Sequence, residues 1–535
     1  MAEHHQAMQR SYRGELTLSA IVEDRAERFG DDVFASDPTG VLTFGQLRDR
    51  AGRVAGWLQE HRIEPGDRVA TMLDAGLTYL AVWFGCAWGG VVEVPVNTDY
   101  KGSFLTHVLQ QSGARVLVME ERWLSRLEGL ELPELEHVVL VPSAAGGAAT
   151  EFATHSIAQV LAHPPVPACP RQPTDLVYIL YTSGTTGPSK GAMHSSQSAI
   201  NSNVLPWLTV LGLSSEDVAY SFFPLFHGTG RNAVTTTTLF LGARVELRSR
   251  FSVGAFWDEV RACGATWFPY MGTVIQLLYA AQPRPDDLDN PVRRAFGGGV
   301  RLELMEAFER RFGLRMFEGY GSTELGQSTL SSVARRSPVT MGPALPHLQL
   351  ETHDEHDRRT APGEPGEIVA RPTGPDSIFK GYWRMPEATL EATRNLWFHS
   401  GDRGVMSEDG HLLFLDRIKD TIRRRGENIS SFEVEAAMAQ HPGVLECAAY
   451  AVELDGEEEV ALAVVTRPGH SIAARELFEF GIERLPRFAV PRYVRFLEAM
   501  PKTPSQRVQK HLLRQEGVAA DAVDREALGI VVARS

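Results

Sequence analysis

The stretch Tyr181-Thr182-Ser183-Gly184-Thr185-Thr186-Gly187-Pro188-Ser189-Lys190-Gly191 decides how the rest of the chain is interpreted. The apolar run before it, residues 176–180, predicts a buried strand, and residues from about 195 to 205 predict a helix after it. Glycines let the backbone approach an anion, hydroxyls and N–H groups point at its oxygens, and Lys190 adds a positive charge. A flexible Ser/Thr/Gly linker is the alternative for such a composition. The order of the residues favours a phosphate-binding loop.

This loop is not the common nucleotide loop Gly-x4-Gly-Lys-Ser/Thr. Lys190 lies three residues after Gly187, and Gly191 follows it where Ser or Thr would stand. A mononucleotide-binding ATPase of that type is therefore a poor fit.

The size and composition of the chain indicate a globular protein of more than one domain. It has 535 residues, of which 43% are hydrophobic and 22% charged. The formal net charge of −14 argues against a nucleic-acid-binding or anionic-membrane surface. Helical and strand patterns alternate from residue 42 to residue 141, which predicts an α/β fold with a largely parallel, helix-covered sheet.

The cysteines and the apolar segments bear on the compartment. Cys86, Cys169, Cys263 and Cys447 form no Cys-x-x-Cys pair, so a disulfide framework or a zinc site is not expected. Residues 1–14 contain no apolar signal core. The most apolar segment, residues 79–96, is broken by three glycines and a glutamate, which predicts buried helix and strand and no membrane span. We expect a cytoplasmic protein.

Three further stretches follow the loop in order: Phe317-Glu318-Gly319-Tyr320-Gly321-Ser322-Thr323-Glu324, then Trp397-Phe398-His399-Ser400-Gly401-Asp402, then Asp416-Arg417-Ile418-Lys419-Asp420. An aromatic plane such as that of Tyr320 suits a purine face, and a carboxylate such as that of Glu324 suits a hard cation between phosphates. Alone, Ser-Gly-Asp is a turn, and the last stretch is a charged interdomain loop.

Together, in this order, these four stretches resemble the adenylate-forming superfamily of acyl-CoA synthetases, luciferases and peptide-synthetase adenylation domains. Residues 96–102 are most similar to those of carnitine- and crotonobetaine-CoA ligases. The resemblance implies a large N-terminal adenylation domain (1–416) of helix-covered, largely parallel sheets. It also implies a hinge (417–420) and a small mobile α+β domain (421–535). Within that domain, residues 431–440 predict a helix with Ser431 as its N-cap.

The resemblance also implies roles for individual residues. Thr182, Ser183, Gly184, Thr185, Thr186 and Gly187 would hold the triphosphate with Lys190. Tyr320 would stack on adenine next to Gly298 and Gly321, Thr323 would contact the α-phosphate, and Glu324 would hold Mg²⁺. Asp402 would accept hydrogen bonds from both ribose hydroxyls, and Arg417 would contact the ribose-phosphate region. Lys419 would be the pivot, with Gly426 and Asn428 in the loop that serves the second step.

Four residues are expected at the acyl pocket by the same resemblance: His227, Arg231, Tyr270 and Gly299. From the residues alone, His227 could be structural, Arg231 a surface arginine, and the segment around Tyr270 plain core. In the functional interpretation the charge of Arg231 pairs with the substrate.

The C-terminal tail departs from the family pattern. Gln506-Arg507 stands where most members carry Gly-Lys, whose lysine reaches the α-phosphate and the carboxylate. Three explanations are open: Arg507 supplies the charge, Lys510 substitutes, or adenylation is slow or altered. We favour Arg507, because arginine supplies nearly all the positive charge of this chain.

The implied reaction has two steps and uses ATP, Mg²⁺ and CoA. A small-molecule carboxylate attacks the α-phosphorus of ATP, giving an acyl-adenylate and pyrophosphate, and the CoA thiol then displaces AMP. Two alternatives remain: an adenylating enzyme that transfers to a carrier protein or an amine, or activates an unusual small anion, and a non-catalytic binding relative. We expect a monomer or a homodimer.

Overall fold

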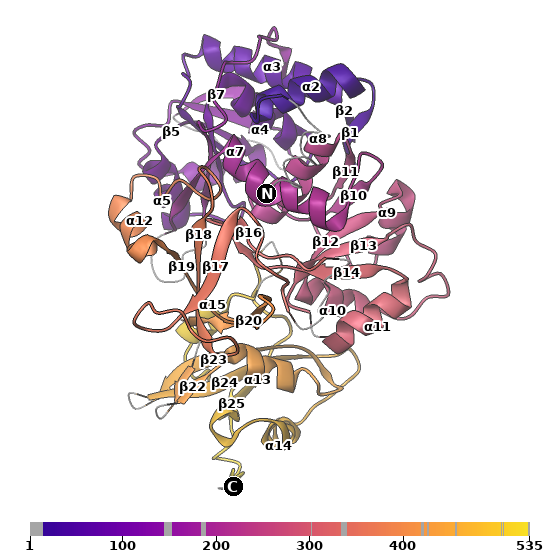
Figure 1. The fold of residues 1–535 in the computed structure, drawn as a ribbon, viewed down its shortest axis with the longest axis vertical. Coiled ribbons are helices and arrows are strands. Elements are labelled where there is room, and N and C mark those ends of the chain that lie inside the picture. Colours follow the sequence, from indigo (N-terminus) through magenta and orange to yellow (C-terminus); the bar gives the residue numbers. More distant parts are fainter. Residues whose placement is uncertain are drawn as a thin grey trace.

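The computed structural model describes residues 14–143, 152–182, 189–300, 302–332, 340–418, 422–424, 427–454, 457–503, 506 and 508–532; of residues 209, 423, 427 and 428 it describes the backbone alone. Figure 1 shows the large N-terminal part above and the smaller C-terminal part below.

Two large sheets form the N-terminal part. Among the described residues, the β8 sheet has the strand order β7 (Ala153–Ser156), β6 (His137–Val141), β5 (Ala114–Glu120), β3 (Arg68–Met72), β4 (Val92–Pro95), β8 (Leu176–Tyr181) and β9 (Gly191–Ser195). The β12 sheet has the order β14 (Arg315–Glu318), β13 (Arg294–Gly298), β12 (Trp267–Met271), β10 (Val218–Ser221), β11 (Arg244–Leu247), β1 (Val33–Asp37) and β2 (Gly40–Thr43). Only the pairs β8–β9 and β1–β2 at the edges are antiparallel in these two sheets as described.

Helices connect and cover these strands. The α-helices are α2 (Leu18–Phe29), α3 (Phe44–Glu60), α4 (Leu77–Gly89), α5 (Ser103–Ser112), α6 (Ile157–Ala162), α7 (Ser196–Ala199), α8 (Thr237–Leu241), α9 (Phe256–Cys263), α10 (Gly272–Ala280) and α11 (Leu302–Phe312). A 3₁₀ segment, η1 (Glu121–Leu127), and three π-helical segments, η2 (Ile200–Val204), η3 (Trp207–Leu211) and η4 (Thr229–Thr236), complete the set.

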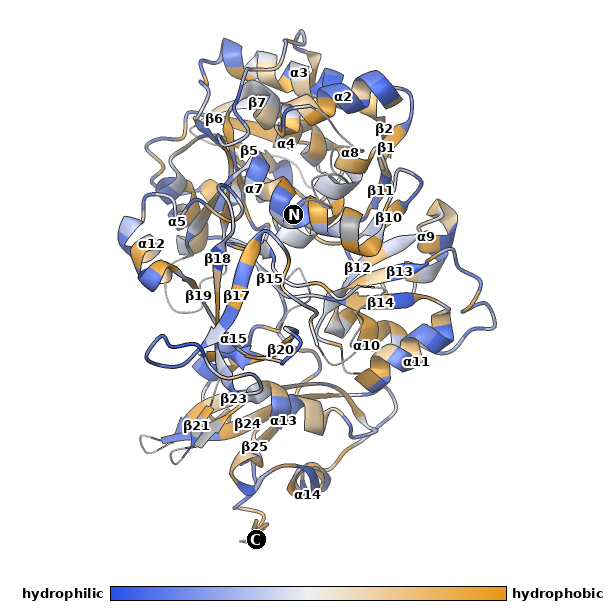
Figure 2. Cartoon of the chain, viewed as in Figure 1, coloured by the Kyte–Doolittle hydropathy of each residue, from blue (hydrophilic) through white to orange (hydrophobic). Residues whose placement is uncertain are grey.

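The hydrophobic cores show that the two sheets are layered. One core joins strands of both sheets with α3 and α4, so these helices lie between the sheets. A second core packs the other face of the β8 sheet against α5 and η1, and a third packs the other face of the β12 sheet against α9, α10 and α11. In Figure 2 the strands and α4 are largely hydrophobic, whereas α2 and α11 carry hydrophilic outer faces. The predicted α/β class with largely parallel sheets is confirmed.

An antiparallel sheet links the N-terminal part to the remainder. Its strands are β17 (Leu348–His353), β18 (Pro365–Pro372), β19 (Phe398–Met406) and β20 (Leu412–Arg417), with α12 (Pro386–Ala392) and the 3₁₀ turn η5 (Arg394–Leu396) before β19. The short pair β15 (Gly321–Ser322) and β16 (Gly326–Gln327) lies between the β12 sheet and this sheet in sequence.

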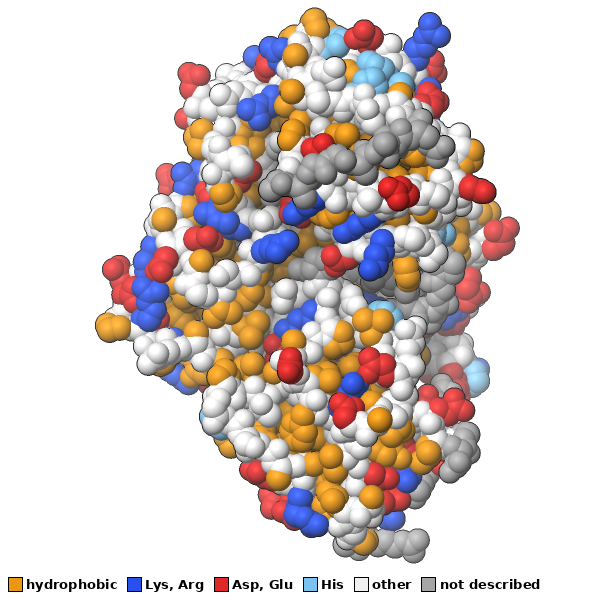
Figure 3. Space-filling model, turned by 180° about the vertical axis from the view of Figure 1, so that it is seen from behind, with side chains coloured by type: hydrophobic (Ala, Val, Ile, Leu, Met, Phe, Trp, Pro, Cys, Tyr) orange, Lys and Arg blue, Asp and Glu red, His pale blue; other side chains and the backbone are white. Residues whose placement is uncertain are grey.

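The C-terminal part is a small α+β unit. It contains β21 (Ile422–Arg424), β22 (Glu427–Ile429), α13 (Ser431–Met438), β23 (Val444–Leu454), β24 (Glu457–Thr466), α14 (Ala474–Arg484), η7 (Arg487–Ala489), β25 (Tyr493–Phe496), α15 (Lys510–Gln515) and β26 (Val523–Asp524). Its central sheet has the order β23-β24-β25-β26, with a hydrophobic core on each face. In Figure 3, hydrophobic side chains reach the surface over this part, and positive and negative side chains alternate above it.

Local structure follows the predicted pattern with two differences. A strand, β9, precedes the helix predicted after the phosphate loop, because Gly191 allows close pairing with β8: a Cβ there would lie 2.6 Å from Cγ2 of Ile179. The predicted N-cap of the helix at 431 is wrong, since Ser430 Oγ caps it by accepting from the Glu433 amide over 3.3 Å. Within the described residues, no helix combines the length and the apolar character needed to cross a membrane.

Candidate active site

The carboxyl ends of the parallel strands β12, β13 and β14 lie side by side, which is where sheets of this kind bind ligands. Strand β13 ends in glycines: a Cβ on Gly298 would lie 3.3 Å from the oxygen of Gly319, and Gly299 has φ +82°. Bare backbone therefore borders this edge of the sheet, so a flat ligand could lie directly against it.

Three predicted nucleotide-binding residues from separate motifs come together beside this edge. The Tyr320 hydroxyl donates to Oδ2 of Asp402 over 2.8 Å, and Nε of Arg417 lies 3.3 Å from Oδ1 of the same carboxylate. Burial and the charge of Asp402 raise the pKa of Tyr320 well above its ordinary value, so the phenol stays protonated and remains a donor. These two contacts fix the orientation of the Asp402 carboxylate.

A second group of predicted residues is joined by an aromatic side chain. The Tyr382 hydroxyl donates to Oε1 of Glu324 over 2.8 Å, and Nζ of Lys190 lies 5.1 Å from the centre of the Tyr382 ring. Burial, with the charge of Glu324, raises the pKa of Tyr382. The loop lysine therefore lies over the face of this ring, and the predicted metal-binding carboxylate lies at its hydroxyl.

Tyr382 is absent from the residues predicted from sequence. The available signal was the run Lys380-Gly381-Tyr382-Trp383, an aromatic pair after a glycine. Gly381 has φ +101°, and the Tyr382 amide donates to Thr389 Oγ1 over 2.9 Å. The turn at Gly381 and the start of α12 fix the ring, and its target lies 58 residues earlier in the chain.

The donor set fits magnesium bound together with phosphates. Glu324 is half-buried and offers hard carboxylate oxygens. In the described part of the chain, no group of three or more His, Cys, Asp or Glu side chains is arranged to hold a metal ion. A cation at Glu324 would therefore take its other ligands from phosphates and water, as Mg²⁺ commonly does.

The structure describes only the two ends of the phosphate loop. Ser183, Gly184, Thr185, Thr186 and Gly187 lie outside the described residues. Thr182 is described, and its amide donates to the Lys190 carbonyl over 3.0 Å, which closes the loop between β8 and β9. The loop thus begins and ends at the carboxyl end of β8, next to Lys190.

Thr323 and Gly321 belong to the turn formed by β15 and β16. A Cβ on Gly321 would lie 2.4 Å from the Gly326 oxygen, so the pair requires glycine there. Behind the turn His194 is buried, and burial lowers the pKa of its imidazole to about 4, opposed by the backbone of Thr323. His194 is therefore neutral at pH 7, and nothing in the sequence singled it out.

Two of the predicted pocket residues occupy strand and turn positions near this edge. Tyr270 is buried in β12, and its hydroxyl donates to the Phe317 carbonyl over 3.1 Å. His227 follows the turn at Pro224, to whose carbonyl its amide donates over 3.1 Å. The carbonyl of His227 accepts from the Arg231 amide over 3.0 Å, where η4 begins.

The predicted role for the charge of Arg231 requires correction. Its side chain is 0% exposed and forms an ion pair with Glu93 of β4, whose side chain is 1% exposed. The guanidinium carbon lies 3.9 Å from the Trp83 ring centre and 4.8 Å from that of Tyr178. Burial alone would lower the pKa of Arg231, but the charge of Glu93, the hydrogen bond to it and the neighbouring Tyr79 and Tyr178 together raise the pKa above its ordinary value. Glu93 already neutralises this guanidinium, so it offers no open charge to a substrate.

The C-terminal tail reaches the N-terminal part close to Gly299. Lys502 and Val508 pair across a hairpin, and at its tip the Gln506 carbonyl accepts from Thr273 Oγ1 of α10 over 3.0 Å. Gln506 has φ +65°, the left-handed conformation that favours glycine. A residue with a Cβ thus adopts, at the glycine position of the family pattern, a conformation that glycine reaches at little cost.

Lys510 lies within the C-terminal part. Its ammonium donates to Ser431 Oγ over 2.6 Å and lies 2.8 Å from Oε1 of Glu435. Ser431 Oγ in turn donates to Oδ2 of Asp416 over 2.6 Å. These contacts disfavour Lys510 as the tail cation of the first step. Arg507, Lys419 and Gly426 lie outside the described residues, as does the side chain of Asn428.

Comparison with known proteins identifies the family of the chain. The AMP-binding enzyme family model matches residues 22–383, and the model of the AMP-binding enzyme C-terminal domain matches residues 433–507. A feruloyl-CoA synthase of Amycolatopsis is 33% identical over 89% of this chain and 94% of its own. The crotonobetaine/carnitine–CoA ligase of Salmonella arizonae is 29% identical over 88% and 93%, respectively. The ATP-bound structure of MatB from Rhodopseudomonas palustris superposes with a TM-score of 0.84 at 27% identity, covering 94% of this chain and 99% of that one.

The resemblance drawn from the four motifs is therefore confirmed, and a crotonobetaine/carnitine–CoA ligase is among the relatives. The matched family model spans most of the N-terminal part that carries Lys190, Glu324 and Tyr382. The chain belongs to the AMP-binding enzyme family, as an AMP-forming acyl-CoA ligase that uses ATP, Mg²⁺ and CoA.

Proposed function

We propose that the chain activates an acid whose acyl part carries no second negative charge, and transfers it to the CoA thiol. The observation that carries this proposal is the buried ion pair of Arg231 with Glu93. Because Glu93 neutralises Arg231, this arginine cannot pair with a second negative charge on the substrate. A dicarboxylate would lack that counter-charge. Aromatic residues such as Tyr270 near the pocket favour an apolar or aromatic acyl group.

The described residues would promote the first step by position and charge. A carboxylate substrate with a pKa near about 4 is already ionised at pH 7, so no general base is required. Lys190 and a cation held at Glu324 would neutralise the phosphate oxygens around the α-phosphorus. Tyr320 and the carboxylate of Asp402 would hold the nucleoside.

The proposed movement between the two steps divides the chain at residues 417–420, with 1–416 as the adenylation domain and 421–535 as the mobile domain. The contact of Gln506 with Thr273 supports an arrangement in which the tail serves the first step. In the second step Gly426 and Asn428 would face the site after rotation about Lys419. We propose Arg507 as the tail cation, and a monomer or homodimer in the cytoplasm as the working form.

A pyrophosphate-release screen tests the substrate proposal. The panel contains hydroxycinnamates, medium-chain fatty acids, a quaternary-ammonium acid and dicarboxylates, each with and without CoA, and products are identified by mass. We expect acyl-CoA from uncharged or aromatic acyl groups, and a preference for dicarboxylates would overturn the proposal. Lys190→Ala and Glu324→Ala should abolish release, whereas Lys101→Ala, an exposed lysine elsewhere, is the matched control.

The tail departure favours one second candidate, an adenylating enzyme with a different acceptor. Gln506 at the glycine position and Arg507 at the lysine position are the observations behind it. This candidate predicts pyrophosphate release without acyl-CoA, and transfer to a carrier protein or an amine. If Arg507 is the working cation, Arg507→Ala should slow adenylation far more than thioester formation from a supplied adenylate, and Lys510→Ala should not.

A further inference from the structure

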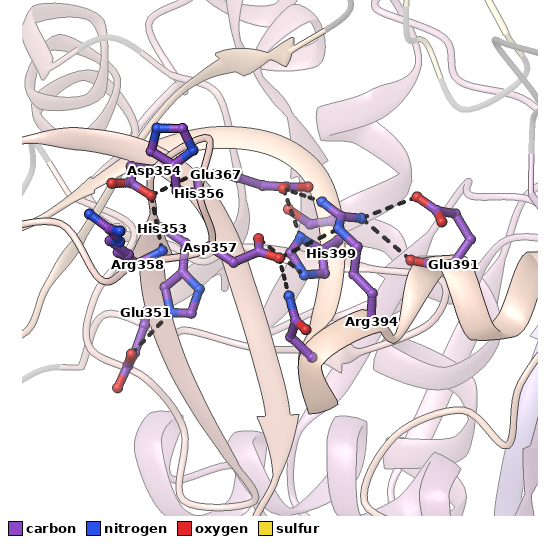
Figure 4. Close-up of polar contacts among 12 residues, drawn as sticks. Glu351, His353, Asp354, His356, Asp357, Arg358, Glu367, Glu391, Arg394 and His399 are labelled. Atoms are coloured by element: carbon purple, nitrogen blue, oxygen red, sulfur yellow. Dashed lines mark hydrogen bonds and ion pairs between the residues drawn. The ribbon is translucent and has the colours of Figure 1, made fainter.

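A polar network gathers around Glu367 of β18, beside the stretch of β19 that leads to Asp402 (Figure 4). Oε2 of Glu367 lies 2.8 Å from Nδ1 of His399 and 3.2 Å from Nη2 of Arg394. Its other oxygen, Oε1, accepts from the backbone amide of Gly401 over 3.0 Å. One carboxylate therefore joins two positively polarised side chains to the backbone of the Ser400-Gly401-Asp402 turn.

The strand pairing explains why that amide is available. Glu367 pairs with Arg403 and Val369 pairs with His399, so residues 400–402 of β19 face a single residue of β18. Such a bulge removes backbone groups from the ladder of hydrogen bonds. Gly401 has φ +68° in this bulge, and its amide donates to the Glu367 carboxylate instead of to a backbone carbonyl of the neighbouring strand.

The same bulge sets the direction of Asp402. Ser400 Oγ donates to the Ile368 carbonyl over 2.5 Å and lies 3.1 Å from the Asp402 amide that donates to it. At the end of the bulge, Asp402 pairs with Arg417 of β20, and its carboxylate accepts from the Tyr320 hydroxyl. A change in the shape of the turn at Gly401 would therefore move the Asp402 carboxylate.

The surroundings of Glu367 are built to hold it still. His399 is 3% exposed at its side chain, and its Nε2 lies 3.7 Å from Oδ1 of Asp357, in the β17–β18 hairpin. Arg394, from η5, also lies 3.8 Å from Asp357 and 3.6 Å from the exposed Glu391. Arg394 and His399 both lie between the carboxylates of Glu367 and Asp357, so Glu367 is held by partners from η5 and from β19.

We propose that Glu367, oriented by His399, is a positioning residue that shapes the Gly401 bulge and so places Asp402 to recognise the ribose hydroxyls of ATP. This inference rests on the proposed function, in which Asp402 contacts the ribose. It adds a residue of β18, 35 positions before Asp402 in the chain, that determines nucleotide specificity without touching the nucleotide.

The chemistry of the carboxylate dictates the variants. A glutamine at 367 has one carbonyl oxygen, so it can accept either from the Gly401 amide or from His399, while its NH₂ group faces the other donor. His399→Asn keeps a donor near the position of Nδ1, whereas His399→Leu removes it. Glu391→Gln is the matched control, because Glu391 also pairs with Arg394 but is 79% exposed and lies away from the turn.

The test measures kcat/KM for pyrophosphate release with ATP, 2′-deoxy-ATP and 3′-deoxy-ATP, using an acid accepted by the wild type. A hydrogen bond to a charged group is worth a factor of about ten or more, so the wild type should prefer ATP by at least about tenfold. Glu367→Gln and His399→Leu should reduce this preference several-fold, whereas His399→Asn and Glu391→Gln should retain it. A uniform loss of activity with the preference intact, in variants that melt like the wild type, would overturn the positioning role.

Asp402→Asn distinguishes the ribose contact proposed for Asp402 from the positioning role proposed for Glu367. If it leaves the preference for ATP unchanged, the ribose assignment of Asp402 fails, and the proposed inference fails with it. If it abolishes the preference while Glu367→Gln does not, the ribose assignment stands and the role of Glu367 alone is refuted. Should Glu367→Gln fail to fold, the contrast between His399→Leu and His399→Asn decides the matter.

Discussion

The hydroxyl of Tyr382 donates a hydrogen bond to Oε1 of Glu324 over 2.8 Å, and the face of the same ring lies 5.1 Å from the ammonium of Lys190. An aromatic ring attracts a cation at its face, and a phenol donates at its edge. Tyr382 therefore orients the carboxylate of Glu324, which is proposed to bind the metal, together with the loop lysine. It does so from a segment that none of the four sequence motifs includes.

Tyr382→Phe should raise the Mg²⁺ concentration needed for half-maximal pyrophosphate release by about three- to tenfold, since one hydrogen bond of about 1 kcal/mol is lost. The ring stays in place, so KM for the acid should change little. Tyr382→Leu should be worse, because it also removes the ring beneath Lys190. Magnesium titrations of both variants provide the measurement.

Tyr279→Phe is the control for this prediction, because that tyrosine is 36% exposed and lies on α10 away from Glu324. It removes the same hydroxyl from a surface position. An unchanged magnesium requirement in Tyr382→Phe, with normal folding, would show that Glu324 is oriented by other groups.

The pair of Arg231 with Glu93 should behave as a structural ion pair. Removing one partner leaves a buried charge without compensation, which typically costs about 3–5 kcal/mol. Arg231→Met and Glu93→Gln should each lower the denaturant midpoint sharply, and the double variant should lose much less than the sum of the two. Guanidinium titrations of the four proteins measure this coupling.

The alternative for Arg231 gives a different result. A guanidinium that binds substrate would raise KM for the acid when replaced, with little change in stability and no coupling to Glu93. That outcome would restore the role predicted from sequence and contradict the buried arrangement.

The fold class and the family could be predicted from the sequence, because the residues that carry the resemblance lie in short contiguous motifs. Tyr320, Asp402 and Arg417 meet as the motif order implied. What could not be predicted are contacts between distant segments. Glu93 lies 138 residues from Arg231 in the chain, and periodicity carries no information on such a pairing.

The errors at element ends have the same origin. Ser430 and Ser431 are equally good caps by composition. The Ser431 hydroxyl is engaged by Asp416 and Lys510, and Ser430 Oγ accepts from the Glu433 amide. Strand β9 was missed because its five residues, Gly191–Ser195, show no apolar alternation of their own. It is a strand because the edge of β8 is open to it.

Glu318 should make stability depend on pH. Burial raises the pKa of this carboxyl to about 7, although the Val300 amide donates to it over 2.8 Å. The folded protein therefore holds a proton that the unfolded chain, with a pKa near about 4.5, has lost. The stabilising contribution is full below about pH 4.5 and declines as pH rises through about 7, by at most about 1.4 kcal/mol per pH unit.

Glu318→Gln should remove this slope, so its stability relative to the wild type should increase from pH 5 to pH 8. Denaturant titrations at four pH values give the comparison, and Glu303→Gln reports the loss of an exposed carboxylate on α11. Parallel pH profiles for the wild type and Glu318→Gln would mean that the carboxyl is ionised in the folded protein.

The left-handed conformation of Gln506 should limit the first step of the reaction. A φ near +65° costs a residue with a Cβ about 1–2 kcal/mol of conformational free energy, whereas it costs glycine little. The strain falls on the tail hairpin where it meets Thr273. Gln506→Gly should therefore favour the docked tail and speed pyrophosphate release several-fold. Gln506→Val, a β-branched residue, should slow it by a similar factor.

Thioester formation from a supplied acyl-adenylate separates a docking effect from a general one, because the tail serves only the first step in the proposed mechanism. Both Gln506 variants should leave that second half-reaction unchanged. Arg62→Gly is the matched control, since Arg62 also has φ +55° but lies at the end of α3, far from the tail in sequence. It should alter stability alone. Equal effects of Gln506→Gly on both half-reactions would contradict the link between tail docking and adenylation. Relief of strain at position 506 would then act on the whole protein and not on the approach of the tail to α10.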